Sequence, residues 1–310
     1  MSTFLDRFLD HLEGVAGASP HTRRAYRSDL GAFLAFLGEE GLSPAAAGRL
    51  DLRRFLSRLA EDRLARSTLA RKVAALKSFY RFLEGAGLAA GNPAAGLRAP
   101  RRARRLPRTL DEGGVTRLLE HSFPDHFLGR RDRAILEVLY STGCRAAELV
   151  GMDLERVELD RGTVRVLGKG GKERVAFLGR PALAALERWL QVRERPPQLG
   201  RGRVEKALFL GRRGRRLTTR RLQEILREAT AAAGLEERVT PHTLRHSFAT
   251  HLLKGGADLR TVQEMLGHAT LAATQIYTAV ETSWLRRIYE KAHPHGGCAA
   301  GVFLDEPGGE

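Results

Sequence analysis

Six residues in the second half of the chain have side chains that together can break and remake a phosphodiester bond. They are Arg145, Lys169, His242, Arg245, His268 and Tyr277. A phenol oxygen can attack phosphorus and form a covalent intermediate. Fixed cationic donors stabilise the charge that builds on the nonbridging phosphate oxygens during such an attack. Five basic groups and one phenol therefore indicate phosphodiester chemistry that needs no metal ion and no cofactor.

Two of the six residues are placed by a helix start. Thr240 is a capping residue, and Pro241 suits the first position of a helix. His242 and Arg245 are three residues apart, so they share one face of the expected helix and can meet one phosphate. A separate apolar stripe of this helix is expected to face the core, formed by Leu244, Phe248 and Leu252.

Lys169 is expected at the tip of a hairpin. Residues 163–167 and 174–178 are short β-rich segments, and Gly168, Gly170 and Gly171 lie between them. The glycine-rich turn is not a nucleotide-binding loop, because it lacks the pattern Gly-x4-Gly-Lys-Ser/Thr and joins two strands rather than a strand and a helix.

Helix stops precede two of the other residues. Arg145 comes directly after Gly143-Cys144, and His268 comes directly after Gly267. A metal site is the alternative interpretation of the histidines, since His242 and His246 are four residues apart. The glutamate of the zinc protease motif is missing, however, and no third ligand is evident.

The order Arg, Lys, His-x-x-Arg, His, Tyr resembles that of the tyrosine site-specific recombinases, and most closely their Xer branch, which resolves chromosome dimers. The spacing matches as well, with 23 residues from Arg245 to His268 and nine from His268 to Tyr277. The resemblance runs from about residue 19 to about residue 293.

The resemblance implies a role for each of the six residues. Tyr277 is the expected nucleophile, which forms a 3′-phosphotyrosyl bond and releases a 5′-hydroxyl. Arg145 and Arg245 are the expected phosphate clamps, and Lys169 is the expected general acid for the leaving oxygen. The two histidines, His242 and His268, are expected to exchange a proton with the reacting groups or to donate to the phosphate.

Glu148 lies three residues after Arg145. It resembles the acidic residue that orients the first arginine in this family, and an ordinary surface glutamate is the alternative interpretation.

Composition favours a soluble protein with a polyanionic partner. The 310 residues carry a formal net charge of +16, and 43% of them are hydrophobic. No apolar run reaches the roughly 18 residues of a membrane span, and the acidic N-terminus does not resemble a signal peptide. Two cysteines, Cys144 and Cys298, do not form a disulfide framework. We therefore expect a cytoplasmic protein without membrane association.

The sequence predicts a mainly α protein with two domains. Residues 1–97 read as a helical, SAM-like core-binding domain, and residues 98–108 as a basic linker. The resemblance implies that the linker contacts DNA phosphates, and a solvated charged surface is the alternative. Residues 109–295 read as the catalytic domain, mainly helical with a small antiparallel β-sheet, and begin with the capping box Thr109-Leu110-Asp111-Glu112. Residues 296–310 read as a disordered tail.

The resemblance implies a recombinase that acts through a Holliday junction at a dif-like site in double-stranded DNA. It implies a homo- or hetero-tetramer with a second Xer-type recombinase, and an FtsK-type translocase as a further partner. Integration of a phage or mobile element is the nearest alternative. A type IB topoisomerase and a non-catalytic DNA-binding protein are the others.

The family also passes a C-terminal helix to a neighbouring protomer. The apolar stripe of Leu285, Ile288 and Ala292 is expected to bind a neighbour in this way. Packing within its own domain is the alternative.

Overall fold

The computed structural model describes residues 3–14, 20–61, 64–99, 109–168, 171–198, 205–267 and 279–297. It is mainly helical, with one small antiparallel sheet, which confirms the predicted fold class. The chain forms two compact units, residues 1–105 and 106–310. The predicted linker, residues 98–108, lies mostly outside the described residues, so its boundaries stay a prediction.

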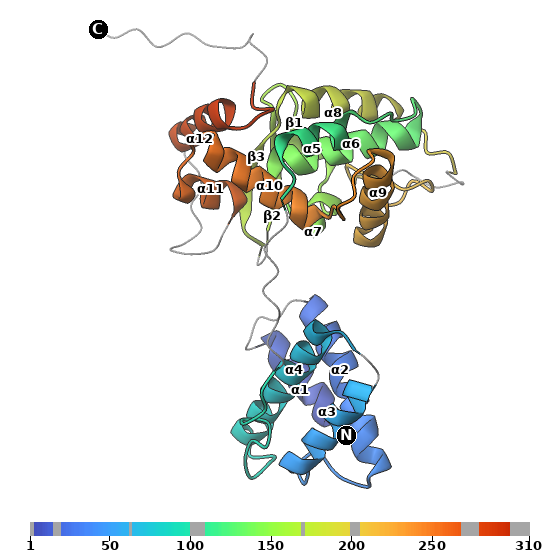
Figure 1. The fold of residues 1–310 in the computed structure, drawn as a ribbon, viewed down its shortest axis with the longest axis vertical. Helices are drawn as coiled ribbons and strands as arrows, with labels where there is room; N and C mark the ends of the chain where they lie inside the picture. The colour runs from blue at the N-terminus through green and yellow to red at the C-terminus, as the bar shows by residue number, and fades with distance from the viewer. Residues whose placement is uncertain are drawn as a thin grey trace. The chain divides into compact units, whose positions relative to one another are not determined.

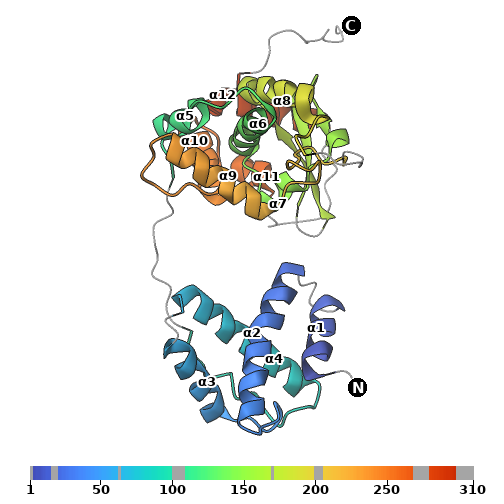
Figure 2. The same ribbon diagram turned by 90° about the vertical axis from the view of Figure 1, so that its right-hand side faces the viewer.

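The first unit consists of helices that pack around aromatic side chains (Figure 2). Their bounds are α1 (Phe4–Gly14), α2 (Pro20–Glu39), α3 (Arg49–Glu61) and α4 (Arg66–Gly85). The buried faces of α2 and α4 line this core, with Leu30 and Phe33 on α2 and Leu76 and Leu83 on α4. The carboxylate of Asp29 in α2 is buried in this unit, with 2% exposure, and pairs with Arg71 and Lys72 of α4.

The second unit contains further helices, one 3-10 turn and the sheet (Figure 1). The helices are α5 (Glu112–Glu120), α6 (Phe127–Thr142), α7 (Ala146–Val150), α8 (Arg180–Arg193), α9 (Thr219–Ala232), α10 (Pro241–Lys254), α11 (Leu259–Leu266) and α12 (Ala279–Ala292), and the 3-10 turn is Leu154–Arg156. Helix α6 lies in the middle of this unit, where nearly every residue of its second half is buried against α8 and α10. The buried packing therefore fixes the position of the end of α6, which directly precedes Arg145.

The sheet has the antiparallel order β1-β2-β3. Strand β2 (Thr163–Leu167) pairs with β3 (Glu173–Phe177) so that Val166 lies opposite Arg174. The predicted hairpin is confirmed, although β3 begins one residue earlier than expected. Strand β1 (Val157–Glu158) was not predicted, because two residues are too few to show a period.

The predicted cap of α5 is wrong by two residues. Helix α5 begins at Glu112, and its N-cap is Asp111, whose side chain accepts a hydrogen bond from the Gly114 amide at 2.7 Å. Asp111 can cap the helix three residues before Gly114, whereas Thr109 lies too far from the exposed amides of the first turn.

The C-terminal stripe packs within its own unit, which was the alternative to the expected contact with a neighbouring protomer. Leu285, Tyr289 and Ala292 of α12 are at most 5% exposed, and they contact a cluster that includes Phe177 and Phe248. In addition, Tyr289 Oη and Ser141 Oγ lie 2.6 Å apart in a hydrogen bond. Helix α12 thus completes the apolar core beside α10 and β3.

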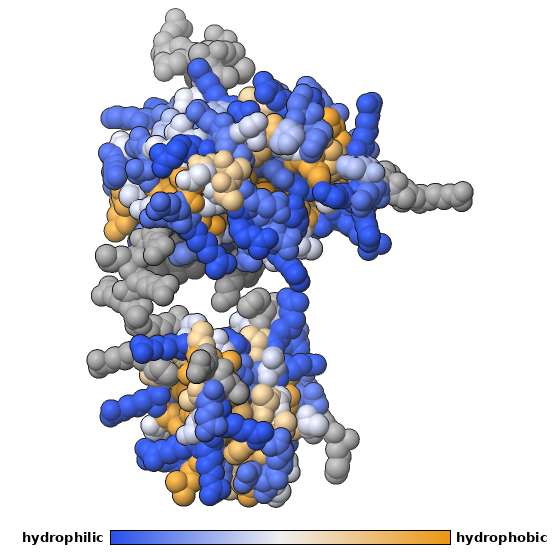
Figure 3. Space-filling view, turned by 45° about the vertical axis from the view of Figure 1, so that its right-hand side comes forward, coloured by the Kyte–Doolittle hydropathy of each residue, from blue (hydrophilic) through white to orange (hydrophobic). Residues whose placement is uncertain are grey.

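Hydrophilic side chains cover much of the surface of both units in Figure 3, with smaller apolar areas among them. Within the described ranges, no helix is long and apolar enough to cross a membrane.

Candidate active site

Arg145 lies where α6 ends and α7 begins. Gly143 ends α6 in the left-handed conformation, with φ of 56°. A Cβ atom at Gly143 would come within 2.5 Å of the Phe248 ring, so both the backbone angle and the space require glycine. Arg145 follows as the extended N-cap residue of α7, and its side chain is 46% exposed. The helix stop therefore turns Arg145 toward solvent, where it can reach a ligand.

Glu148 is a buried partner of Arg145, so the interpretation as a surface glutamate is wrong. Its side chain is 5% exposed. Glu148 Oε1 accepts a hydrogen bond from Arg145 Nη1 at 2.7 Å, and Oε2 accepts one from the Arg145 amide at 2.9 Å. Burial acts to raise the pKa of Glu148, but the charge of Arg174 and the hydrogen bonds from Arg145 outweigh it and lower that pKa. Glu148 therefore stays ionised and fixes the direction of Arg145.

Arg174 is a member of this group that the sequence reasoning missed. It is 6% exposed on β3, donates from Nη2 to Glu148 Oε2 at 3.1 Å, and donates from Nε to the Met265 carbonyl at 2.9 Å. Its position in the strand was a usable signal. Arg174 and Ala176 share the buried face of β3, and an arginine at an inward position of a strand needs a partner.

Arg245 joins two helix ends that are distant in sequence. It is 7% exposed on α10, and it donates from Nη1 to the Gly143 carbonyl at 2.7 Å and from Nη2 to the Leu266 carbonyl at 2.8 Å. Burial, followed by the positive charge of Arg145, lowers the pKa of Arg245 to about 10. Arg245 thus remains charged at neutral pH, and Arg145 lies close enough to affect its electrostatic potential.

His242 lies one turn before Arg245 in α10 and is exposed. The predicted helix start is confirmed: Thr240 caps α10 and Pro241 is in its first turn. Leu244, Phe248 and Leu252 are buried as predicted. Because those residues fill the core, His242 remains on the accessible side.

The other three predicted site residues, Lys169, His268 and Tyr277, lie outside the described residues. The chain before and after Lys169 is described, and so is the residue just before His268. Gly168 and Lys172 close the β2–β3 hairpin with a 2.7 Å backbone hydrogen bond, and Gly267 ends α11 with φ of 66°, as predicted. The positions of the three side chains remain predictions.

The described part of the site is strongly positive. Among the described residues, the guanidinium groups of Arg145 and Arg174 pair with the carboxylate of Glu148, and Arg245 lies close enough for all three charges to affect its pKa. Among the described residues, no group of three or more histidine, cysteine, aspartate or glutamate side chains could hold a metal ion. The described site has more guanidinium groups than carboxylates, and one of these groups, Arg145, is half exposed and can reach a ligand. Such a site favours an anion such as phosphate.

Comparisons with known proteins cover nearly the whole chain. The profile of the phage integrase family matches residues 108–283, and the profile of the phage integrase N-terminal SAM-like domain matches residues 5–87. The chain is 46% identical over 298 residues to tyrosine recombinase XerC of Azotobacter vinelandii, with 95% of this chain and 97% of that protein covered. It is 41% identical over 295 residues to tyrosine recombinase XerD of Chlorobaculum tepidum, with 94% and 96% covered.

One solved structure adds a comparison of the fold. The structure of the XerH site-specific recombinase bound to palindromic difH substrate, a post-cleavage complex, matches with a TM-score of 0.66. It is 24% identical, and the match covers 90% of this chain and 83% of that one. At this identity the match supports the shared fold alone. Together with the two family profiles it confirms the predicted combination of a SAM-like helical domain and a recombinase-type second domain.

Proposed function

The chain belongs to the phage integrase family, and we propose that it is an Xer-type tyrosine recombinase that cuts and rejoins double-stranded DNA at specific sites. The observation that supports this most directly is the excess of positive charge formed by Arg145, Arg174 and Arg245 around Glu148. Burial of Arg174 and Arg245 reduces their solvation, so these charges gain strongly from an anion in front of them.

Strand cleavage begins with Tyr277 in this proposal. Its phenol oxygen attacks the scissile phosphorus, the bond from phosphorus to the 5′-oxygen breaks, and a 3′-phosphotyrosyl bond forms. Arg145 and Arg245 hold the nonbridging oxygens while negative charge builds on them. Because the phosphodiester energy is kept in the tyrosyl bond, attack by a 5′-hydroxyl rejoins the strand without ATP.

Proton transfer completes the step. Lys169 protonates the leaving 5′-oxygen, and His242 accepts the proton of the attacking phenol or donates to the phosphate. His268 donates to the same phosphate. Exchange of one pair of strands produces a Holliday junction, and exchange of the second pair resolves it.

Resolution of chromosome dimers is the proposed biological task, and the curated relatives named XerC and XerD support it. The proposed partners are a dif-like DNA site and a tetramer formed with further copies or with a second Xer-type recombinase. An FtsK-type translocase is proposed as a further partner, and the cytoplasm as the location. The proposed division of the chain is core-binding domain 1–97, linker 98–108, catalytic domain 109–295 and tail 296–310.

A nicked suicide substrate tests the chemistry. After cleavage the short 5′-hydroxyl fragment diffuses away, so the wild-type protein should accumulate as a covalent DNA adduct on a denaturing gel. Tyr277→Phe removes one hydroxyl and should form no adduct while it still shifts DNA in a native gel. An adduct with the Phe variant would show that another residue is the nucleophile.

Paired sites test the reaction class. A recombinase should exchange strands between two copies of a dif-like site, whereas a type IB topoisomerase should relax a supercoiled plasmid that has a single site or none. DNA binding without any adduct would favour the non-catalytic alternative and contradict the proposal.

A further inference from the structure

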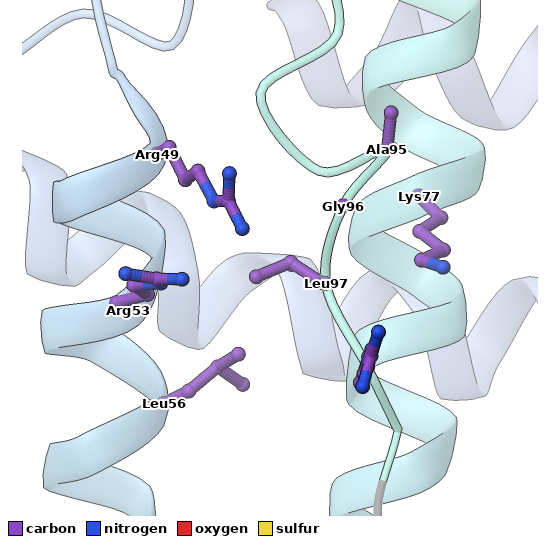
Figure 4. A pocket seen from close by; sticks show the side chains of 8 residues that line it. Arg49, Arg53, Leu56, Lys77, Ala95, Gly96 and Leu97 are labelled. Atoms are coloured by element: carbon purple, nitrogen blue, oxygen red, sulfur yellow. The ribbon is translucent and has the colours of Figure 1, made fainter.

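The first unit contains a basic hollow of about 810 Å³ between α3, α4 and the segment that follows α4 (Figure 4). Arg49, Arg53 and Lys77 line it. This hollow belongs to the core-binding domain, whose contact with DNA is part of the proposed function. The second unit contains a smaller hollow that has no part in that function.

The smaller hollow, called here the α6–α8 hollow, has a volume of about 470 Å³ and is lined by residues from the start of α6 and the later turns of α8. These two helices lie side by side in Figure 1. Arg130 and Arg133 come from α6, and Arg188 and Gln191 come from α8. Arg130 stands twelve residues before the end of α6, which is about 18 Å of helix. The hollow is therefore separate from the active site, which begins at that end of α6.

Two arginines of the hollow have no counter-charge. Asp125 accepts hydrogen bonds from Arg130 Nε at 2.6 Å and from Arg130 Nη2 at 3.1 Å, so these two charges offset each other. Within the described ranges, the guanidinium groups of Arg133 and Arg188 form no ion pair and no hydrogen bond. Two uncompensated guanidinium groups at one hollow favour a ligand with two anionic groups.

The α6–α8 hollow also has an apolar wall. Phe123, Pro124 and Ala185 line it beside the arginines, and Phe123 is held by packing against the core of this unit. A bare inorganic anion would leave this wall in contact with water. A ligand that carries an apolar side chain next to carboxylates would cover the wall and pair with the arginines at once.

The C-terminal end of this chain contains a segment of that composition. Residues 302–306, the acidic segment, have the sequence Val-Phe-Leu-Asp-Glu, and residues 296–310 contain no basic residue. The net charge of the chain is +16, so this segment has the sign of charge that is rare in it and that the hollow attracts. The acidic segment lies outside the described residues, and its place is inferred from the points below.

The last described residue, Gly297, lies beside the start of α8. A Cβ atom at Gly297 would lie 4.0 Å from Arg180 Nε. Arg180, Ala184 and Arg188 follow at intervals of four residues, so they share one stripe of α8, and all three are exposed. The helix rises about 12 Å from Arg180 to Arg188, and the five residues from Gly297 to the acidic segment span up to about 17 Å. The acidic segment can therefore reach the hollow of its own unit.

We propose that the acidic segment docks in the α6–α8 hollow of its own chain, with its two carboxylates at Arg133 and Arg188 and with Phe303 against Phe123. This contact goes beyond the proposed function and uses no residue of the active site. It replaces the expectation of a disordered tail for residues 302–306. Docking ties the chain that follows α12 to α6 and α8, so it adds to the packing that holds α12 in its own unit.

Disulfide trapping in the whole chain tests the contact. Gln191→Cys places a thiol at the hollow and Leu304→Cys places one in the acidic segment, while Cys298→Ser removes a competing thiol and Cys144 is 0% exposed. Under mild oxidation an intrachain disulfide should form, seen as a monomer that migrates faster on a non-reducing gel. In the control, Gln223→Cys on the exposed surface of α9 replaces Gln191→Cys, and trapping should be about tenfold slower.

Charge substitutions in the trapping protein show whether the arginines hold the segment. Arg133→Gln/Arg188→Gln should slow the formation of the disulfide by about fivefold to tenfold, the range expected for the loss of two solvent-accessible ion pairs. Arg213→Gln/Arg227→Gln is the matched control, because it removes two exposed positive charges elsewhere in the same unit. The control should change the rate by less than about twofold.

The acidic side of the contact should respond in the same way. Asp305→Asn/Glu306→Gln should slow trapping by a similar factor in the parent protein. It should add little in the Arg133→Gln/Arg188→Gln background, because the same contact has already been lost there. Fully additive effects would show that the carboxylates do not meet these arginines, and would overturn the proposal.

Amide hydrogen exchange tests the effect on α12. In the Arg133→Gln/Arg188→Gln variant, the amides of the last turn of α12 should exchange about threefold or more faster than in the Arg213→Gln/Arg227→Gln control, because the chain after α12 is no longer held. Equal exchange in the two variants would overturn the restraint of α12.

Three results of the trapping experiment would also refute the docking. A disulfide that forms no faster than in the Gln223→Cys control would mean that the segment does not occupy the hollow. A disulfide found only between two chains would place the segment on a neighbour. A rate that neither set of charge substitutions changes would mean chance collision. All of these measurements are made without DNA, so their outcome is independent of recombinase activity.

Discussion

Replacement of Glu148 should damage both the stability of the second unit and the cleavage step. Its carboxylate is 5% exposed and accepts hydrogen bonds from Arg145 and from Arg174, which is 6% exposed. Glu148→Gln keeps the shape of the side chain and one acceptor oxygen, but it removes the negative charge. The buried guanidinium of Arg174 then has no counter-charge.

The magnitude follows from the exposure of the two partners. Loss of one member of a buried ion pair costs about 3 to 5 kcal/mol. Arg145 is 46% exposed, so water screens its share of the loss to about 1 kcal/mol or less. We therefore expect a destabilisation of about 3 kcal/mol, most of it from Arg174.

Tryptophan fluorescence during urea unfolding can measure this loss in the second unit alone. The chain has two tryptophans, Trp189 and Trp284, and both belong to that unit. Trp189 is fully buried and donates to the Leu208 carbonyl at 2.9 Å, so its emission reports the native core. The first unit contributes no tryptophan signal.

Glu173→Gln is the matched control, since Glu173 precedes Arg174 and forms an exposed ion pair with Arg156 at 2.6 Å. That pair should contribute about 1 kcal/mol or less. The double variant Glu148→Met/Arg174→Met should recover much of the lost stability, because both buried charges are then removed together. If Glu148→Gln costs no more than Glu173→Gln, or if the Met substitutions are simply additive, the buried pair does not stabilise the unit as argued.

Cleavage provides a second readout of the same change. Arg145 loses the carboxylate that directs it, so adduct formation by Glu148→Gln at saturating DNA should fall by roughly tenfold to a hundredfold. DNA affinity should change much less, because many other phosphate contacts remain. Equal losses of affinity and cleavage would argue against a positioning role for Glu148.

Three further perturbations have defined outcomes. Arg245→Lys keeps the charge but cannot bridge the Gly143 and Leu266 carbonyls, so adduct formation should fall by about a hundredfold; a loss below threefold in a single-turnover assay would contradict the clamp. Lys169→Ala should lose cleavage of normal DNA and regain it with a 5′-phosphorothiolate substrate, whose sulfur needs little protonation; failure of that rescue in a variant that binds normally would exclude the general-acid role. Burial lowers the pKa of His293 to about 3, whereas the unfolded chain binds the proton near pH 6.5. The free energy of unfolding should therefore fall as the pH drops from about 6.5 toward 3. His293→Phe should flatten this fall in urea titrations, and an unchanged pH slope would refute the assignment.

Much of the fold could be predicted from local signals. The helix start at Thr240-Pro241 and the stops at Gly143 and Gly267 are found where the sequence placed them. These starts and stops depend on groups within one helical turn. A side-chain oxygen accepts hydrogen bonds from the exposed amides at a helix start, and a glycine adopts the left-handed backbone angle at a helix end. Strand β1 was not predicted because two residues are too few to show a period. The cap of α5 was predicted wrongly because Asp111 and Thr109 are both capping residues and differ only in their distance from the first turn.

The sequence by itself was enough to predict the chemistry of this protein. The identities, order and spacing of Arg145, Lys169, His242, Arg245, His268 and Tyr277 resemble those of tyrosine recombinases, and this resemblance predicts phosphodiester transfer through a tyrosine. The excess of basic residues likewise follows from a count alone, and it is typical of a protein with a nucleic-acid partner.

Only the tertiary structure decided which charges are buried and what they contact. Arg245 meets the carbonyl of Gly143, 102 residues away in the chain, and Arg174 meets Glu148 across 26 residues. Helix α12 likewise packs against its own unit, where the sequence reasoning favoured a contact with a neighbour. The physical reason is common to all three: desolvation and packing depend on every segment that closes around a side chain, and no local pattern records which segments those are.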